Sequence, residues 1–501
     1  MRKIFLNYLI YSKKKQIGIT RNLVPSMWET VIGLEIHVQL ATESKLFSSS
    51  STDFGSQQNT QASIIDLAMP GVLPVLNKKA VDMAIMFGLA VDAKIADKSI
   101  FARKNYFYPD LPKGYQISQY ELPVVYDGKL EINVDGKKKI IGITRAHLEE
   151  DAGKSIHDLF DGESAIDLNR AGTPLIEIVS EPDMRSAKEA VTYLKKIHSI
   201  VKSLGISDGN MEEGSFRCDA NISLRKPGDP FGIRAEIKNI NSFRFVESAI
   251  NFEVDRQQDI IESGGTVNQE TRLYDPKKDE TRPMRSKEEA NDYRYFPDPD
   301  LLPVEITDKQ ISNIKKILPE LPDSKKERLI SQYNIKNDDA EILSLSSQLF
   351  EYFEKASQDI SSAYQLLANF ILSEVVGLCN KHNLDISEAK VNAKDVAKLN
   401  NYINDGKISM KQAKDVLSES WESNKRVDDI IKSKNIEQIS NPDLLLNEAK
   451  KILEKHPKEV QDYKNGKDKL IGFFVGQIMK ETKGKANPKT INQILNKLLK
   501  G

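Results

Sequence analysis

The sequence has little cysteine and no long hydrophobic segment. Only Cys218 and Cys379 occur among 501 residues, which excludes a disulfide scaffold and any zinc module built on cysteines. The longest apolar run, residues 83–91, lies between two aspartates and is far too short to cross a bilayer. We therefore expect a soluble protein from a reducing compartment.

Neither sign of charge is in excess over the whole chain, since 72 basic and 73 acidic residues give a net charge of -1. The distribution is uneven, however. Residues 1–26 carry six basic and no acidic residues, and residues 447–501 carry 13 lysines against 6 acidic residues. A basic tail on an acidic body indicates an anionic partner. A solvated, lysine-rich helical surface explains the tail equally well.

The length corresponds to roughly three domains at ~150 residues each, and 39% hydrophobic residues exclude whole-chain disorder. Residues 1–26 are either an organelle transit segment or an upstream extension of a bacterial chain whose body begins at Met27. Residues 27–318 read as α+β, residues 319–430 as an all-α domain, and residues 431–501 as a small helical tail domain.

The N-terminal body shows strand and cap signals. Period-two alternation predicts strands at 31–40, 140–149, 217–224 and 234–238, separated by turn signals, and hence a largely antiparallel sheet. Asn77 and Ser186 are suited to cap helices that run to Leu89 and to about Leu204.

Polar residues collect on one face of these predicted strands. In the first strand Glu35, His37 and Gln39 share a face, while the intervening residues are apolar. The pattern recurs at 217–224 and 234–238, and Glu177 lies inside an apolar run where a carboxylate is costly unless it is ligated or paired. Acids, an imidazole, arginine and lysine on one face are typical of a phosphate and divalent-cation site, although surface salt bridges are the simpler alternative.

Several familiar catalytic motifs are missing. Residues 153–155 end like a phosphate-binding loop, but Leu148 stands where the first glycine is required. The sequence has no G-x-G-x-x-G, H-E-x-x-H or G-x-S-x-G motif. Cys218 falls on the apolar face of its strand and is predicted to be a core residue. If the reaction uses ammonia, this chain has no evident means of releasing it from glutamine, which indicates a partner.

Two segments rich in aromatic residues and proline, 106–116 and 293–300, are predicted to be loops or sheet edges. Their density of tyrosine and arginine suits a partner interface or a stacked base. Packing of the loops themselves explains it nearly as well.

Taken together, these motifs resemble those of the B subunit of the aspartyl/glutamyl-tRNA(Asn/Gln) amidotransferase, the GatB/GatE family. The resemblance extends from Trp28 to the C-terminus. It rests on segments 29–38 (ETVIGLEIHV), 106–116 (YFYPDLPKGYQ), 147–154 (HLEEDAGK), 169–177 (NRAGTPLIE), 211–221 (MEEGSFRCDAN), 236–239 (EIKN) and 282–288 (RPMRSKE).

The resemblance implies an antiparallel-sheet cradle domain, a helical domain and a YqeY-like tail that binds tRNA. It also implies a ligase that forms a carbon–nitrogen bond in protein biosynthesis. Such proteins use ATP to phosphorylate the side-chain carboxylate of Glu-tRNA(Gln) or Asp-tRNA(Asn). Ammonia from glutamine, released in the amidase partner GatA, then displaces phosphate, and the small partner GatC completes a heterotrimer.

The resemblance also assigns roles to residues. The metal, Mg²⁺ or Mn²⁺, is expected on His37, Glu150 and Glu177, with Glu35 holding a coordinated water. Strand alternation groups Glu149 with His147, so the choice between Glu149 and Glu150 stays open. The expected catalytic residues are Glu212, Arg217, Asp219, Asn221, Glu236 and Lys238, and the expected ATP-binding residues are Arg170, Arg217, Arg234, Lys238 and Asn239.

Two other functions fit the residues. The chain could be a stand-alone ATP-dependent amide ligase acting on a small carboxylate, or a non-catalytic tRNA-binding scaffold. Cytoplasmic location in a bacterium is expected, and the mitochondrial matrix or a plastid is the alternative if residues 1–26 are a transit segment. The preference between Asp-tRNA and Glu-tRNA depends on which synthetases accompany the protein.

Overall fold

The computed structural model describes residues 28–160, 162–284, 293–434, 442–465, 467, 470–482, 486 and 488–500. The chain divides into two compact units, Met1–Leu318 and Pro319–Gly501. The predicted basic extension, residues 1–26, lies outside the described residues, so its role and the cellular compartment stay predictions. Among the helices in the described ranges, none combines the length and apolar character that a membrane span requires.

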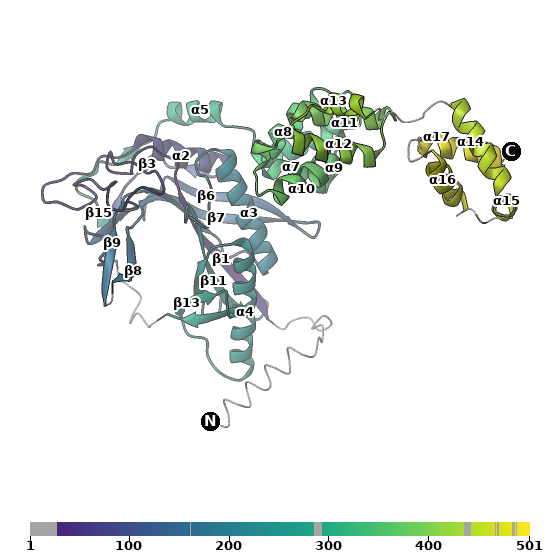
Figure 1. Ribbon diagram of the computed structural model, residues 1–501. Coiled ribbons are helices and arrows are strands. Elements are labelled where there is room, and N and C mark those ends of the chain that lie inside the picture. The colour runs from purple at the N-terminus through teal and green to yellow at the C-terminus, as the bar shows by residue number, and fades with distance from the viewer. Residues whose placement is uncertain are drawn as a thin grey trace. The chain divides into compact units, whose positions relative to one another are not determined.

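A twelve-stranded sheet organises the N-terminal unit (Figure 1). Its main path runs β14-β13-β12-β11-β1-β10-β7-β5-β4-β15; off this path, β6 pairs with β7 and β2 pairs with β6. Strands β12 and β13 are parallel, whereas the pairs that surround β1, β10 and β7 are antiparallel, which confirms the predicted α+β class. The strands are β1 (Glu29–Gln39), β2 (Lys94–Ile95), β3 (Lys98–Ser99), β4 (Ala102–Asn105), β5 (Tyr115–Ser118), β6 (Val125–Val134), β7 (Lys137–Glu150), β8 (Lys154–Phe160), β9 (Glu163–Asp167), β10 (Pro174–Ser180), β11 (Phe216–Arg225), β12 (Ala235–Ile240), β13 (Glu270–Asp275), β14 (Glu280–Pro283), β15 (Phe296–Pro297) and β16 (Val304–Glu305).

One face of this sheet is apolar and is covered by helices. On β1 the side chains of Leu34, Ile36 and Val38 are buried, and each such burial contributes ~1.5–3 kcal/mol to folding. Helices α2 (Lys78–Ala90), α3 (Ala187–Ser203) and α4 (Phe243–Glu262) lie along the outer side of the curved sheet (Figure 1). The alternating polar residues therefore point to the opposite, uncovered face. Cys218 is buried on the apolar side, as predicted.

Local capping explains where these helices begin. Asn77 accepts a hydrogen bond from the backbone N–H of Lys79 at 2.9 Å, and Ser186 accepts one from Glu189 at 3.2 Å, which confirms both predicted caps. Ser242 caps α4 in the same way, by accepting from the N–H of Phe245. The strand and cap signals of the sequence did not mark α4 as a separate helix.

The named elements among the described residues of the C-terminal unit are all helices, as predicted. Its apolar residues form two clusters, one within 329–431 around Phe353 and Trp421 and one within 445–499 around Phe474 and Ile478. Helix α5 (Asp308–Ile317) closes the first unit. The following helices are α6 (Pro322–Tyr333), α7 (Asn337–Leu345), α8 (Ser347–Ser357), α9 (Tyr364–Phe370), η1 (Ile371–Val375), α10 (Val376–Lys381), η2 (Ile386–Glu388), α11 (Ala393–Asn404), α12 (Met410–Ser423), α13 (Val427–Ser433), α14 (Pro442–Lys455), α15 (Pro457–Lys464), α16 (Leu470–Glu481) and α17 (Pro488–Lys500).

Candidate metal centre and its surroundings

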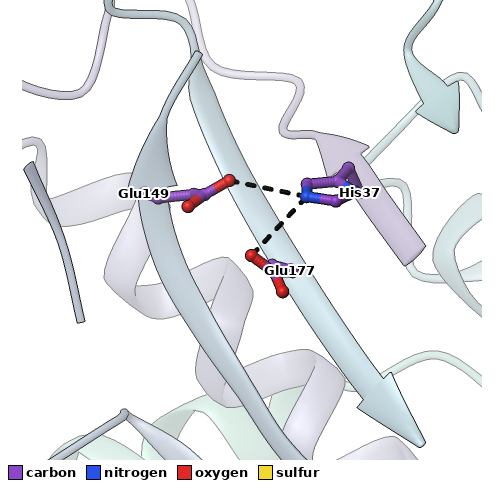
Figure 2. Close-up of side chains that lie close together, drawn as sticks. All are labelled: His37, Glu149 and Glu177. Atoms are coloured by element: carbon purple, nitrogen blue, oxygen red, sulfur yellow. Dashed lines mark ion pairs between the residues drawn. The ribbon is translucent and has the colours of Figure 1, made fainter. Parts of the chain in front are cut away.

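Four side chains from three neighbouring strands converge on the polar face of the sheet. In the sheet register, His37 on β1 lies opposite Glu177 on β10, and Glu177 lies opposite His147 on β7. Glu149 follows His147 by two residues, so its side chain leaves β7 on the same face. Figure 2 shows His37, Glu149 and Glu177 pointing toward one another.

The distances in this cluster link each imidazole to both carboxylates. His37 Nε2 lies 3.5 Å from Glu177 Oε2 and 3.7 Å from Glu149 Oε1. His147 Nε2 lies 3.3 Å from Glu177 Oε2 and 3.9 Å from Glu149 Oε2. His37, Glu149 and Glu177 offer ligand atoms that all lie within 4.8 Å of one another, close to the spacing of ligands around one small cation.

The electrostatics of the cluster favour a positive charge between the two carboxylates. Burial alone would lower the pKa of His37, but the hydrogen bond to Glu177 and the charges of Glu177 and Glu149 outweigh it and raise this pKa to about 9. Burial would raise the pKa of Glu177, but His147 and His37 hold it well below its usual range. A positive charge is thus favoured at the place that a bound cation would take. Two carboxylates and one imidazole fit Mg²⁺ or Mn²⁺.

The prediction that Glu150 belongs to this cluster is not supported by the geometry, which places Glu149 there instead. Consecutive residues of a strand point to opposite faces, so the Glu150 carboxylate leaves β7 on the other side. It pairs with the ammonium group of Lys113, its Oε2 at 2.6 Å. Its Oε1 also accepts the backbone N–H of Ile117 at 2.9 Å. Glu150 is therefore engaged by a half-buried lysine, away from His37.

A second polar group lies beside the first, on β11 and β12. Lys238 Nζ lies 2.7 Å from Asp219 Oδ2 and 2.9 Å from Glu236 Oε1. Asn221 donates to Glu35 Oε1 at 2.9 Å. Burial, together with the charges of Glu177 and Glu236, raises the pKa of Glu35. Glu35 therefore stands between the two groups, with an amide rather than a cation as its hydrogen-bond partner.

The pairing of β11 with β12 is irregular beside this second group. Cys218 pairs with Ile240 and Ala220 pairs with Ile237, so β12 has one extra residue at this point. Asn239 adopts a φ of 65°, a conformation that asparagine tolerates better than most residues. Its side chain donates to the backbone carbonyl of Tyr274 at 3.2 Å. Asn239 thus ties β12 to β13, and no contact joins it to the polar group in the described residues.

A third network surrounds Asp151, at the end of β7. Its Oδ2 accepts hydrogen bonds from Gln39 at 2.9 Å and from Arg217 at 3.0 Å. Arg170 lies 3.6 Å away and donates to the carbonyl oxygens of Ala152 and Gly153. Burial would raise the pKa of Asp151, but the two guanidinium groups outweigh burial and lower it. Arg217 is thereby held beside His37, which lies opposite it in the pairing of β1 with β11.

Two further predicted residues, Arg234 and Glu212, lie outside the cluster of His37, Glu149 and Glu177. Arg234 precedes β12, and its charge helps to lower the pKa of Glu236. Glu212 is exposed in the turn that precedes β11, where it lines a cavity with Arg170. The structure therefore divides the predicted set between the two polar groups, the network around Asp151, and this cavity.

The sequence did not reveal that a lysine and several tyrosines lie beside His37, Glu149 and Glu177. Lys104 on β4 lies 5.0 Å from the centre of the Tyr293 ring. Burial would lower its pKa, but the negative charges of Glu149 and Glu177 outweigh burial and raise it. Tyr106 packs edge-on against Tyr293. The aromatic segments are evident in the sequence, but nothing in a four-residue strand indicates that Lys104 faces the carboxylates.

The comparisons with known proteins agree over nearly the whole chain. The family described as the GatB/GatE catalytic domain matches residues 30–312, and the GatB domain matches residues 351–499. The chain is similar to proteins named as the B subunit of aspartyl/glutamyl-tRNA(Asn/Gln) amidotransferase. It is 59% identical to that of Thioalkalivibrio sulfidiphilus, over 94% of this chain and 99% of the relative. It is 55% identical to that of Acinetobacter baylyi (97% and 99%) and 56% identical to that of Coxiella burnetii (94% and 100%).

Proposed function

Since this chain belongs to the GatB/GatE family of tRNA-dependent amidotransferases, we propose that it catalyses the ATP-dependent amidation of mischarged tRNA on the polar face of its sheet. The substrate is Glu-tRNA(Gln), Asp-tRNA(Asn) or both. The products are Gln-tRNA(Gln) and Asn-tRNA(Asn) for translation. The observation that carries the proposal is the convergence of His37, Glu149 and Glu177 within the matched catalytic domain.

The reaction proceeds in two balanced steps. A side-chain carboxylate oxygen attacks the γ-phosphorus of ATP, ADP leaves, and an acyl phosphate forms. Ammonia then attacks the acyl carbon, the carbon–oxygen bond to phosphate breaks, and loss of a proton leaves the amide. Activation is required because a carboxylate is a poor electrophile, and phosphate is a far better leaving group than oxide.

We assign a divalent cation, Mg²⁺ or Mn²⁺, to His37, Glu149 and Glu177. When bound, this ion supplies charge neutralisation at phosphate oxygens. Glu35 stands beside it and is suited to accept a hydrogen bond from a coordinated water. His147 contacts both carboxylates and orients them.

The cationic side chains around the cluster neutralise the charge that phosphoryl transfer spreads over the phosphate oxygens. Lys238 is held by Asp219 and Glu236, and Arg217 is held by Asp151. Side chains that are already fixed need little reorganisation when charge develops. We assign ATP to the part of the polar face formed by β11 and β12, where Lys238 lies. Arg217 then stands between ATP and the acceptor carboxylate.

Ammonia comes from a partner. Both cysteines of the chain are buried, so neither offers an accessible thiol nucleophile to glutamine. The partner is the glutamine-hydrolysing amidase GatA, and the small protein GatC completes the heterotrimer. We further propose that residues 431–501 contact tRNA, because the lysine excess of this tail suits a phosphate backbone.

The test is reconstitution of the complex with GatA and GatC. Wild-type complex should form amide on mischarged tRNA only when ATP and a divalent cation are present. His37→Ala should abolish amidation while glutamine hydrolysis by GatA and assembly persist. Normal amidation by that variant would remove the assigned centre. ATP consumption without tRNA would indicate a stand-alone ligase, and full activity after replacing Glu177 would indicate a scaffold.

A further inference from the structure

A buried ionic network lies on the helix-covered face of the sheet, and its centre is Glu253 of α4, a fully buried carboxylate. Arg256 donates two hydrogen bonds to this carboxylate, Nη2 to Oε1 at 2.6 Å and Nε to Oε2 at 2.9 Å. Thr281 on β14 donates to Oε2 at 3.1 Å. The Nε atom of Arg272, on β13, lies 3.4 Å from the same oxygen. Glu253 therefore connects α4 to the two strands at this edge of the sheet.

The same network reaches the strand on the other side of β12. Gln257, which follows Glu253 by one helical turn, donates to Glu253 Oε1 at 2.9 Å and to the backbone carbonyl of Ile222 at 3.0 Å. Ile222 belongs to β11, and in the sheet order β12 lies between β11 and β13. Through α4, the network thus holds the two neighbours of β12 relative to each other.

The two strands held in this way carry side chains that fix β12 on the polar face. Since residues alternate between faces along a strand, Thr271 points to the polar face whereas Arg272 points to α4. Thr271 donates to Glu236 Oε2 at 2.8 Å. Lys238 Nζ lies 2.9 Å from Glu236 Oε1 and 2.7 Å from Asp219 Oδ2 on β11. The position of Lys238 therefore depends on the spacing of β11 and β13.

The composition of the network suits positioning better than stability. Apolar residues of similar volume often replace a buried ionic network without loss of stability, or with a gain. The network also contains a buried oxygen, Gln257 Oε1, that has no hydrogen-bond partner among the described residues, and such a group costs stability. Apolar packing tolerates small shifts of one element against another, whereas hydrogen bonds of defined length and angle do not. The network therefore fixes the distances from α4 to its neighbouring strands.

We propose that Glu253 is a positioning residue for the ATP-dependent step, because its network fixes the separation of β11 and β13 and thereby the position of Lys238. This inference rests on the proposed function, in which Lys238 neutralises phosphate charge. Glu253 is fully buried on the covered face, so it touches neither substrate. A misplacement of about 1 Å, caused far from the chemistry, can cost about a hundredfold in rate. The partial shift expected here corresponds to about a tenfold effect.

The test uses the reconstituted complex with GatA and GatC. Glu253→Gln keeps the volume of the side chain and removes the charge that holds Arg256 and Arg272. It should raise the KM for ATP about tenfold and leave the KM for Glu-tRNA unchanged. Ile250→Ala is the matched control, since Ile250 is fully buried on the same helix and is apolar. The control should lower the unfolding temperature and leave the KM for ATP unchanged.

Two combined variants separate positioning from stability. Glu253→Met combined with Arg272→Met should unfold at a higher temperature than Glu253→Gln and still show the raised KM for ATP. Thr271→Val added to Glu253→Gln should raise this KM by less than the product of the two single effects, because both changes act on Glu236 and Lys238.

Three results would overturn the inference. The first is a wild-type KM for ATP in Glu253→Gln, or an equal rise of this KM in the Ile250→Ala control. The second is a return to the wild-type KM in the double methionine variant, which would leave the network a purely structural role. The third is a combined effect with Thr271→Val that equals the product. Failure of the proposed function is distinct, because wild-type complex would then form no amide on mischarged tRNA.

Discussion

Replacing Glu149 or Glu150 by glutamine distinguishes the roles of the two faces of β7. The residues are adjacent, and each change removes one negative charge at nearly constant volume. Glu149→Gln removes one of the three ligand groups of the proposed metal centre. The Oε1 atom of Glu149 lies 3.7 Å from His37 Nε2. Glu150→Gln removes instead the partner of Lys113.

The two substitutions are expected to differ in their effect on metal affinity. Loss of an outer-shell partner typically lowers metal affinity ~10–100-fold, so loss of a ligand carboxylate should lower it by at least that factor. Breaking a buried ion pair costs ~3–5 kcal/mol of stability. Glu150→Gln should fall at or below the lower end, because the glutamine oxygen can still accept the N–H of Ile117. It should leave the metal affinity within about a factor of three, since the lost charge lies on the face of β7 opposite the proposed metal centre.

The assay is equilibrium binding of Mn²⁺ to the full-length chain without ATP, so that metal bound to nucleotide does not contribute. Glu149→Gln should weaken Mn²⁺ binding, and it should also lower the unfolding temperature, because Glu149 is buried and lies 3.7 Å from His37. Glu150→Gln should bind Mn²⁺ normally and unfold at a lower temperature. The reverse pattern, with Mn²⁺ binding lost in Glu150→Gln and kept in Glu149→Gln, would refute the assignment of Glu149.

Three further outcomes follow from contacts in the structure. Asp66→Ala leaves the fully buried ammonium of Lys45 without its carboxylate and should destabilise the first unit by ~3–5 kcal/mol. Calorimetry should show that adding Lys45→Met recovers much of this loss of stability. A single variant as stable as the wild-type protein would contradict this prediction. Thr271→Val removes a 2.8 Å hydrogen bond to Glu236, worth ~1.5–3 kcal/mol to a charged acceptor; steady-state kinetics should show a higher KM for ATP and an unchanged KM for tRNA. Deleting residues 431–501 should weaken tRNA binding and flatten its salt dependence, and equal affinity at low salt would exclude the tail as a tRNA contact.

The sequence by itself determined the fold class and the chemistry of the polar face. Alternation of apolar and polar residues is a local property of a strand, so the common face of Glu35, His37 and Gln39 could be read directly. Helix caps are equally local, and Asn77 and Ser186 could be identified for that reason. The position of Glu177 in an apolar run also marked it as paired or ligated, because burial of a lone carboxylate is costly.

Tertiary structure decided which of these faces meet. Alternation grouped Glu149 with His147, but only the register of β7 against β10 shows that this pair, and not Glu150, faces His37. Register depends on contacts between residues distant in sequence, which no local pattern contains. The same reason hid Lys104, whose strand reaches the carboxylates only through its place in the sheet order. The chemistry available to the protein is therefore encoded locally, whereas the assembly of that chemistry into one site depends on how the strands pair.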